Sequence, residues 1–145
     1  MAKINLDNVR GVKTFSVLAD KEYENGALVG LGDLVEGEPN LYNVVEATAD
    51  NAYLITTPEV HRDSNSSSID WTNEEGSIMR VHQLEKGDIF TVEKAVHASG
   101  LAAGTQAGVT GNQFTAAGED GAFAVVIEEG TIGGDAREAI SLRVL

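Results

Sequence analysis

The histidines are the first candidates for chemistry in this 145-residue chain, because an imidazole can bind a metal or transfer a proton near neutral pH. The three of them, His61, His82 and His97, stand in no paired spacing such as His-x-His or His-x-x-x-His. A zinc or iron site would need these distant residues to converge with a carboxylate in the folded chain. We expect them to be surface or hydrogen-bonded sheet histidines, and we predict no metal or other cofactor.

Other patterns that support catalysis or ligand binding are incomplete. Asp63, Asn65, Ser67 and Asp70 loosely resemble a calcium loop, but the required glycine and distal glutamate are out of register. The glycine-rich stretch 99–111 has no Gly-Lys-Ser/Thr and no helix pattern after it, so it does not predict a phosphate site. The chain has no cysteine and no Gly-x-Ser-x-Gly elbow. We predict that it is not an enzyme and has no catalytic residue.

The charge of the chain argues against two classes of binding partner, nucleic acids and anionic membranes. Ten Lys and Arg residues stand against 23 Asp and Glu residues, which gives a formal net charge of -13. Nucleic-acid phosphates and anionic membranes both attract cationic surfaces. We therefore expect no direct binding to nucleic acid and no membrane association.

Short apolar runs between polar turns dominate the chain. In the stretch 83–93, a Lys-Gly-Asp turn precedes a run rich in β-branched and aromatic residues, which is typical of a strand start. No window sustains helical periodicity beyond a few turns. The sequence predicts an all-β fold, a small sandwich or barrel of short antiparallel strands with at most short helical turns. Strands are expected at 12–19, 27–31, 41–47, 52–56, 77–83, 89–92, 113–116, 122–128 and 138–145.

Local signals add detail to these strands. Asn25-Gly26 predicts a hairpin turn between the first two of them. The runs 41–47 and 52–56 are expected to form another hairpin, with Tyr42 and Tyr53 paired across it. The run 122–128 is apolar on both faces, which predicts a central strand. We expect residues 99–111 to form either a long loop or a glycine-rich segment that is ordered only by its neighbours. We expect at most a turn or two of helix after Thr57 and Pro58.

The N-terminal segment differs from the rest. Residues 1–14 carry three cations and one anion, a net +2, so residues 15–145 carry −15. One interpretation is a first strand or frayed terminus. The other is an N-terminal arm, residues 1–14, that adds a strand to another chain, followed by a single β-rich domain, residues 15–145. Trp71, in a polar segment, either caps the barrel or anchors a partner. The candidate partner-binding residues are Lys3, Ile4, Leu6, Arg10, Lys13 and Trp71.

The chain is small, acidic, cysteine-free and rich in predicted strands, and it has a candidate N-terminal arm. It also contains the segments Glu24–Val29, Leu84–Val92 and Ala139–Val144. In these features it resembles the capsid decoration (head auxiliary or cement) proteins of tailed bacteriophages. The resemblance implies a structural virion protein that binds the outer surface of a phage capsid and stabilises the shell. Its partner would be the major capsid protein, and it would act as a monomer or as a homo-trimer. No signal peptide is evident, so we expect synthesis in the host bacterial cytoplasm and a final place on the capsid exterior.

Two other classes remain open. The chain could be another phage structural β protein, such as a tail tube or baseplate subunit. It could also be a non-viral β-barrel that binds a ligand or acts as an enzyme. A pocket with converging polar groups would favour the ligand-binding class.

Overall fold

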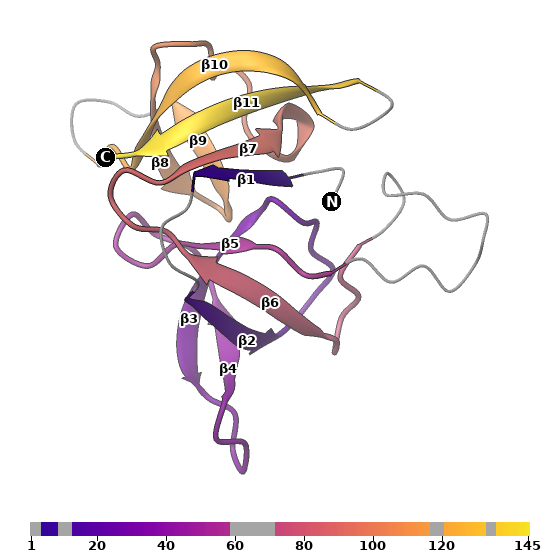
Figure 1. The fold of residues 1–145 in the computed structure, drawn as a ribbon. Coiled ribbons are helices and arrows are strands. Elements are labelled where there is room, and N and C mark those ends of the chain that lie inside the picture. The colour runs from indigo at the N-terminus through magenta and orange to yellow at the C-terminus, as the bar shows by residue number, and fades with distance from the viewer. Residues whose placement is uncertain (1–3, 9–12, 59–71, 117–120, 133–135) are drawn as a thin grey trace.

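The computed structural model describes residues 4–8, 13–58, 72–116, 121–132 and 136–145 (Figure 1). These residues form eleven strands and a single 3-10 turn, η1 (Lys94–Val96). The prediction of an all-β fold with at most short helical turns is confirmed. Among the described residues, no helix is long and apolar enough to cross a membrane.

Five strands close into a barrel in the order β2-β4-β3-β5-β6. Alternate side chains point inward, and the barrel encloses a core of eight buried residues. Most pairings are antiparallel, as expected, but β2 and β4 run parallel, with Val17 opposite Tyr42. The barrel strands are β2 (Thr14–Leu18), β3 (Leu28–Leu34), β4 (Leu41–Val45), β5 (Tyr53–Ile55) and β6 (Ile78–Gln83).

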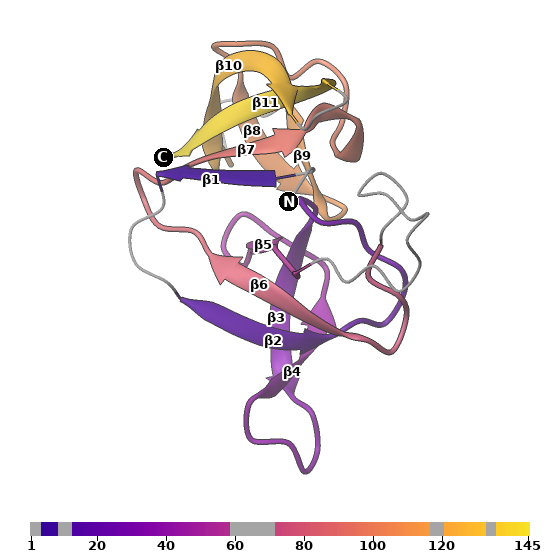
Figure 2. The same cartoon turned by 45° about the vertical axis from the view of Figure 1, so that its right-hand side comes forward.

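The remaining strands form a six-stranded sheet in the order β1-β7-β11-β10-β8-β9. This sheet lies over one side of the barrel in both views (Figures 1 and 2). Its strands are β1 (Ile4–Asn8), β7 (Ile89–Glu93), β8 (Gln106–Thr110), β9 (Gln113–Ala116), β10 (Ala124–Ile132) and β11 (Arg137–Val144).

A shared core joins the sheet to the barrel. Leu28 and Leu54 are paired residues of β3 and β5, and their side chains pack with sheet residues such as Phe90 and Phe114. Asn112, at the turn between β8 and β9, adds two hydrogen bonds to the barrel. Its carbonyl oxygen accepts the N–H of Leu28 at 3.0 Å, and its Oδ1 accepts the N–H of Ala47 at 2.9 Å. The two layers therefore form one packed unit.

A recurring turn starts several strands. In 24–27, 74–77 and 85–88, a hydrogen bond joins the fourth N–H to the first carbonyl, and a glycine at the third position has positive φ. Glycine adopts this conformation without the steric cost that a side chain would bring, as a type II turn requires. Each turn is followed at once by a strand, which begins at Leu28, Ile78 or Ile89.

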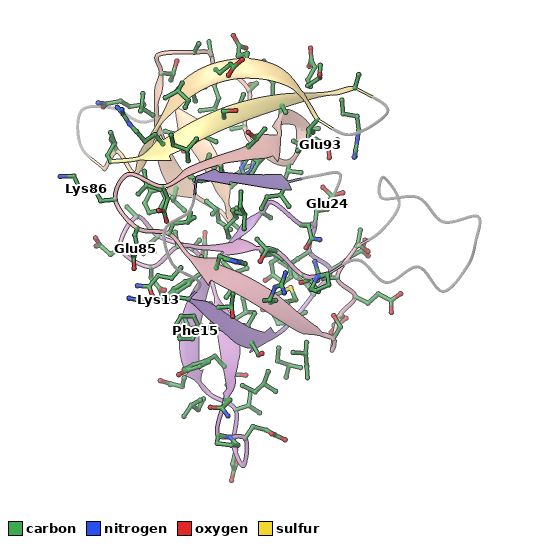
Figure 3. The ribbon with its side chains drawn as sticks, in the orientation of Figure 1. Lys13, Phe15, Glu24, Glu85, Lys86 and Glu93 are labelled. Atoms are coloured by element: carbon green, nitrogen blue, oxygen red, sulfur yellow. The ribbon has the colours of Figure 1, made fainter. Side chains whose placement is uncertain are left out.

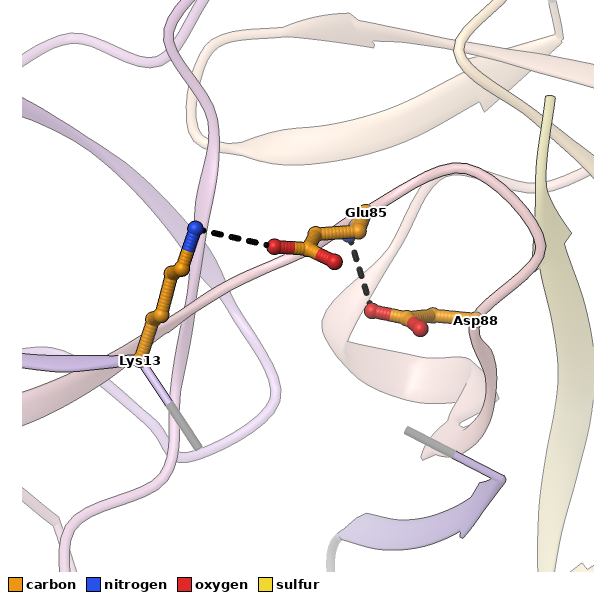
Figure 4. Close-up of polar contacts among 3 residues, drawn as sticks. All are labelled: Lys13, Glu85 and Asp88. Carbon is orange, nitrogen blue, oxygen red and sulfur yellow. Dashed lines mark hydrogen bonds and ion pairs between the residues drawn. The ribbon is translucent and has the colours of Figure 1, made fainter. Parts of the chain in front are cut away.

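The third of these turns connects the barrel to the sheet. Asp88 is fully buried, and its carboxylate accepts the N–H of Glu85 at 2.8 Å (Figure 4). Val144 of β11 exchanges backbone hydrogen bonds with the last two residues of this turn, Gly87 and Asp88. This polar turn, from which the sequence predicted a strand start, thus fixes the connection between β6 of the barrel and β7 of the sheet.

Several pairing predictions are wrong, although the strand positions are close. β2 pairs with β4 and β6, so the Asn25 turn does not join a hairpin of β2 and β3. β4 and β5 flank β3 on opposite sides, so Tyr42 and Tyr53 are not cross-strand partners. The stretch 99–111 is not a long loop throughout, because it contains β8, which is ordered by its neighbouring strands. The helical turn expected after Pro58 falls mainly outside the described residues.

The central position predicted for residues 122–128 is confirmed for β10, which lies between β11 and β8. The strand expected at 138–145 is also present, as β11. Ile140, Leu142 and Val144 are buried in the shared core.

Candidate interaction surface

Three aromatic rings from three barrel strands meet at one end of the barrel. The ring of Phe15 contacts Tyr42 edge-on, with centroids 5.9 Å apart, and Tyr53 edge-on at 5.7 Å. All three side chains are partly exposed. Phe15 lies two residues before the fully buried Val17 on β2, so it continues the inward-facing row to the mouth of the barrel.

Leu34 extends this row towards solvent. It stands opposite Tyr42 in the register of β3 and β4, and 48% of its surface is exposed. We call the four residues Leu34, Tyr42, Phe15 and Tyr53 the aromatic strip. Partly exposed aromatic side chains supply large contact area at a small cost in conformational entropy, which is the composition of many protein-binding surfaces.

Lys13 lies beside the aromatic strip, two residues before Phe15 (Figure 3). Its ammonium group is 3.2 Å from a carboxylate oxygen of Glu85 (Figure 4). The two side chains are 61% and 43% exposed, so the pair contributes little to stability. Lys13 is therefore a candidate partner-binding residue that the structure places next to an aromatic surface.

The other predicted partner-binding residues do not gather there. Ile4 is 2% exposed and packs in the shared core, because β1 pairs with β7 of the same chain. Its side chain is thus not available to another chain, which corrects the expectation for this residue. Leu6 is partly buried against the same core. Lys3, Arg10 and Trp71 lie outside the described residues.

His97 is a structural histidine. It is 7% exposed, and its Nδ1 accepts the backbone N–H of Phe114 at 2.9 Å. Nε2 therefore carries the proton and donates to the carbonyl oxygen of Gly26, also at 2.9 Å. Burial lowers the pKa of His97 to about 4, although the bond to Gly26 acts in the opposite direction. Both ring nitrogens are occupied, so His97 has no free nitrogen for a metal or a substrate.

His82 is also buried. Its Nδ1 contacts the hydroxyl of Thr56, a residue that is itself fully buried. Burial and the nearby charge of Arg80 lower the pKa of His82. His61 lies outside the described residues. Within the described part of the chain, no group of three or more histidine, aspartate or glutamate side chains could hold a metal ion.

A groove of about 440 Å³ lies beside η1 and the start of β11. Three of its charged lining residues are in ion pairs, since Arg137 contacts Glu93 at 3.0 Å and Lys94 contacts Glu129 at 3.1 Å. The hydrogen bond from Lys94 lowers the pKa of Glu129. His97, which also lines the groove, keeps both ring nitrogens in other hydrogen bonds. The groove thus offers polar contacts, most of which are already made within the chain.

Comparisons of the chain with protein-family models, with curated proteins and with solved structures found no match.

Sequence reasoning missed the aromatic strip. The alternation of residues 15, 17 and 19 in the expected strand 12–19 indicates only that Phe15 shares a face with Val17 and Ala19. It could not show that Tyr42 and Tyr53 reach Phe15 from opposite sides, because this depends on the parallel pairing of β2 with β4. Parallel contacts have no local sequence signal comparable to a hairpin turn.

Proposed function

We propose that this chain is a structural virion protein that binds the outer surface of a phage capsid and stabilises the shell. The aromatic strip carries the proposal, because it gathers four partly exposed apolar side chains from four barrel strands on one surface. Such a surface suits a flat or gently hollowed protein partner better than a small molecule. The partner in this proposal is the major capsid protein.

The proposed mechanism is physical. A decoration protein adds interface free energy at many equivalent places on a lattice, so each contact can be modest. The net charge of -13 would keep decorated particles soluble and apart. The barrel and the sheet share one core, so the aromatic strip lies on a well-packed support. This limits the conformational entropy lost on binding.

Co-sedimentation with empty shells tests the proposal. The shells are assembled from the major capsid protein encoded in the same genome, in the unexpanded and the expanded form. Saturable binding to expanded shells, with a fixed copy number per capsid subunit, is the expected result. An unrelated protein of similar size and charge serves as the control. Failure to bind either form, or assembly of the purified protein into tubes, contradicts the proposal.

A further inference from the structure

The hairpin between β3 and β4 projects beyond the barrel. In both views its loop forms the extremity of the molecule on the side away from the six-stranded sheet (Figures 1 and 2). The neighbouring strand β5 pairs with β3 only at Leu28 and Val29, so the later part of β3 continues without that neighbour. We call residues 32–42 the finger.

The base of the finger is held by close packing. The Cγ atoms of Val45 lie over two glycines of β3, and a Cβ added to Gly30 or Gly32 would come within 2.7 or 2.9 Å of them. The side-chain amide of Asn51 adds two hydrogen bonds to Leu31. Its Oδ1 accepts the N–H of Leu31 at 3.0 Å, and its Nδ2 donates to the carbonyl of Leu31 at 3.1 Å. Asn51 thus takes the place of a neighbouring strand.

The tip of the finger is also ordered by hydrogen bonds. The N–H of Val35 donates to the carbonyl of Leu41 at 2.8 Å, and the N–H of Glu38 donates to the carbonyl of Val35 at 3.0 Å. Gly37 has a φ of 80°, which suits this turn. The finger is therefore preorganised, and docking it on a partner would cost little ordering entropy.

The side chains of the finger combine apolar and acidic character. Leu34 is nearly half exposed, and its neighbour Tyr42 joins the finger to the rest of the aromatic strip. No lysine or arginine occurs between Lys21 and Arg62. The exposed carboxylates on the finger and just after it are those of Asp33, Glu36, Glu38 and Glu46.

We infer that the finger is the docking element for the capsid shell, and that it enters an apolar hollow of the major capsid protein bordered by lysine or arginine side chains. This inference rests on the proposed function and adds the chemistry of the contact. Leu34 would fill the hollow, and Glu36 and Glu38 would meet its cationic border. Complementary charges of this kind favour encounter and fix the orientation of binding.

A second copy of the chain fits the finger less well. Lys13, Lys94 and Arg137 are each engaged with a carboxylate of the same chain, whereas Lys21, Lys86 and Arg143 are exposed. Each copy carries a net charge of -13, so two copies repel one another at long range. A cationic surface on another protein is therefore the better complement.

Two pairs of matched variants test the inference on expanded shells. Glu36→Gln with Glu38→Gln changes the finger, and Glu74→Gln with Glu75→Gln makes the same change in net charge at another exposed glycine turn. The finger variant should bind shells about tenfold more weakly, as expected for the loss of two modest charge contacts. Its affinity should also depend less on salt concentration. The Glu74/Glu75 variant should bind like the wild type.

The second pair isolates the apolar contact. Leu34→Ser should weaken binding about tenfold, as expected for the loss of one partly buried leucine contact. Ile78→Ser removes a more exposed aliphatic side chain, 59% exposed, and should leave affinity unchanged. Urea denaturation of each variant verifies that it is folded as stably as the wild type.

The outcomes separate the two proposals. If the wild type binds shells and the finger variants bind equally well, the finger is not the docking element, while the proposed function stands. Equal losses in the finger and control variants would show a response to overall charge, which also overturns the inference. If the wild type binds no shell, or associates only with itself in sedimentation, the proposed function and the inference both fall.

Discussion

The backbone N–H of Phe114 donates to Nδ1 of His97 at 2.9 Å, and this bond fixes the proton of a buried imidazole on Nε2. The protonated Nε2 in turn donates to Gly26, at the start of the barrel wall. A single neutral side chain therefore joins the edge strand β9 to the barrel. A second proton on the ring would place two N–H groups face to face at Phe114.

We predict that stability falls as pH decreases from 6.5 to 4. Burial lowers the pKa of His97 from 6.5 to about 4, so the unfolded chain takes up a proton at a higher pH than the folded chain. The contribution of His97 is fully present above pH 6.5, and about 3 kcal/mol of it is lost by pH 4. Urea denaturation at pH 7.5, 5.5 and 4.5 measures this loss.

His97→Gln identifies the source of the pH effect. The variant should be less stable than the wild type at pH 7.5, and the difference should shrink on acidification, because glutamine does not titrate. His82→Gln is the matched control and should leave the His97-dependent loss in place. Parallel curves for the wild type and His97→Gln would show that His97 does not cause the effect.

Asn112 provides a second prediction, about the contact between the β8–β9 turn and the barrel. Its φ of 65° is the left-handed conformation, and its Oδ1 accepts the N–H of the buried Ala47. Asn112→Gly keeps the backbone conformation but leaves that N–H unpaired, which should cost about 1–3 kcal/mol. Asn112→Ala should cost about 1 kcal/mol more, because alanine is strained there. Denaturant midpoints measure both.

Asn112→Asp is the control for this prediction. Aspartate tolerates the same backbone conformation and keeps an acceptor oxygen in the position of Oδ1. The aspartate variant should therefore lose less stability than the glycine variant. If the glycine variant matches the wild type, the bond to Ala47 does not contribute to stability.

The two ion pairs with the clearest contrast in burial give a third prediction. The side chains of Arg137 and Glu93 are 15% and 13% exposed, against 61% and 43% for Lys13 and Glu85. Double-mutant cycles should give a coupling of about 1–3 kcal/mol for the first pair and below about 1 kcal/mol for the second. The coupling of the exposed pair should also fall in 1 M salt. Equal couplings would contradict this role of burial.

The sequence predicted the fold class and most strand positions, because both depend on local signals. One local signal is a glycine followed by a small or polar residue and then by an aliphatic residue that begins a strand. It occurs at Gly26, Gly76 and Gly87. In the expected strand 77–83, period-two alternation also indicates that Met79 and Val81 share a face, and both are fully buried.

Pairing was harder to predict, because it depends on contacts between distant segments. Tyr42 and Tyr53 are close in sequence, so a hairpin was the simplest local prediction. The structure instead inserts β3 between their strands and brings Phe15 against both rings. The same limit applies to the candidate surface, because Tyr42 comes to lie beside both Leu34 and Phe15 only when the barrel strands pair.

Gly30 supports the last prediction, which concerns the base of the finger. A Cβ at this position would lie 2.7 Å from Cγ2 of Val45 and 2.9 Å from the carbonyl oxygen of Glu46. Gly30→Ala should therefore destabilise the protein by about 1–3 kcal/mol through overpacking. Gly130→Ala is the matched control in β10, because nothing lies within 4 Å of its added Cβ. It should leave stability unchanged or raise it by up to about 1 kcal/mol.

The double variant Gly30→Ala with Val45→Ala separates the two clashes. Val45 is a partly exposed side chain that could yield, whereas the carbonyl of Glu46 belongs to the backbone and cannot retreat without moving β4. Removing the Cγ atoms should restore part of the lost stability, and the backbone clash should retain the rest. Full restoration would assign the whole penalty to Val45. No restoration would assign it to the backbone, and equal effects at Gly30 and Gly130 would show that close packing under the finger does not constrain this strand.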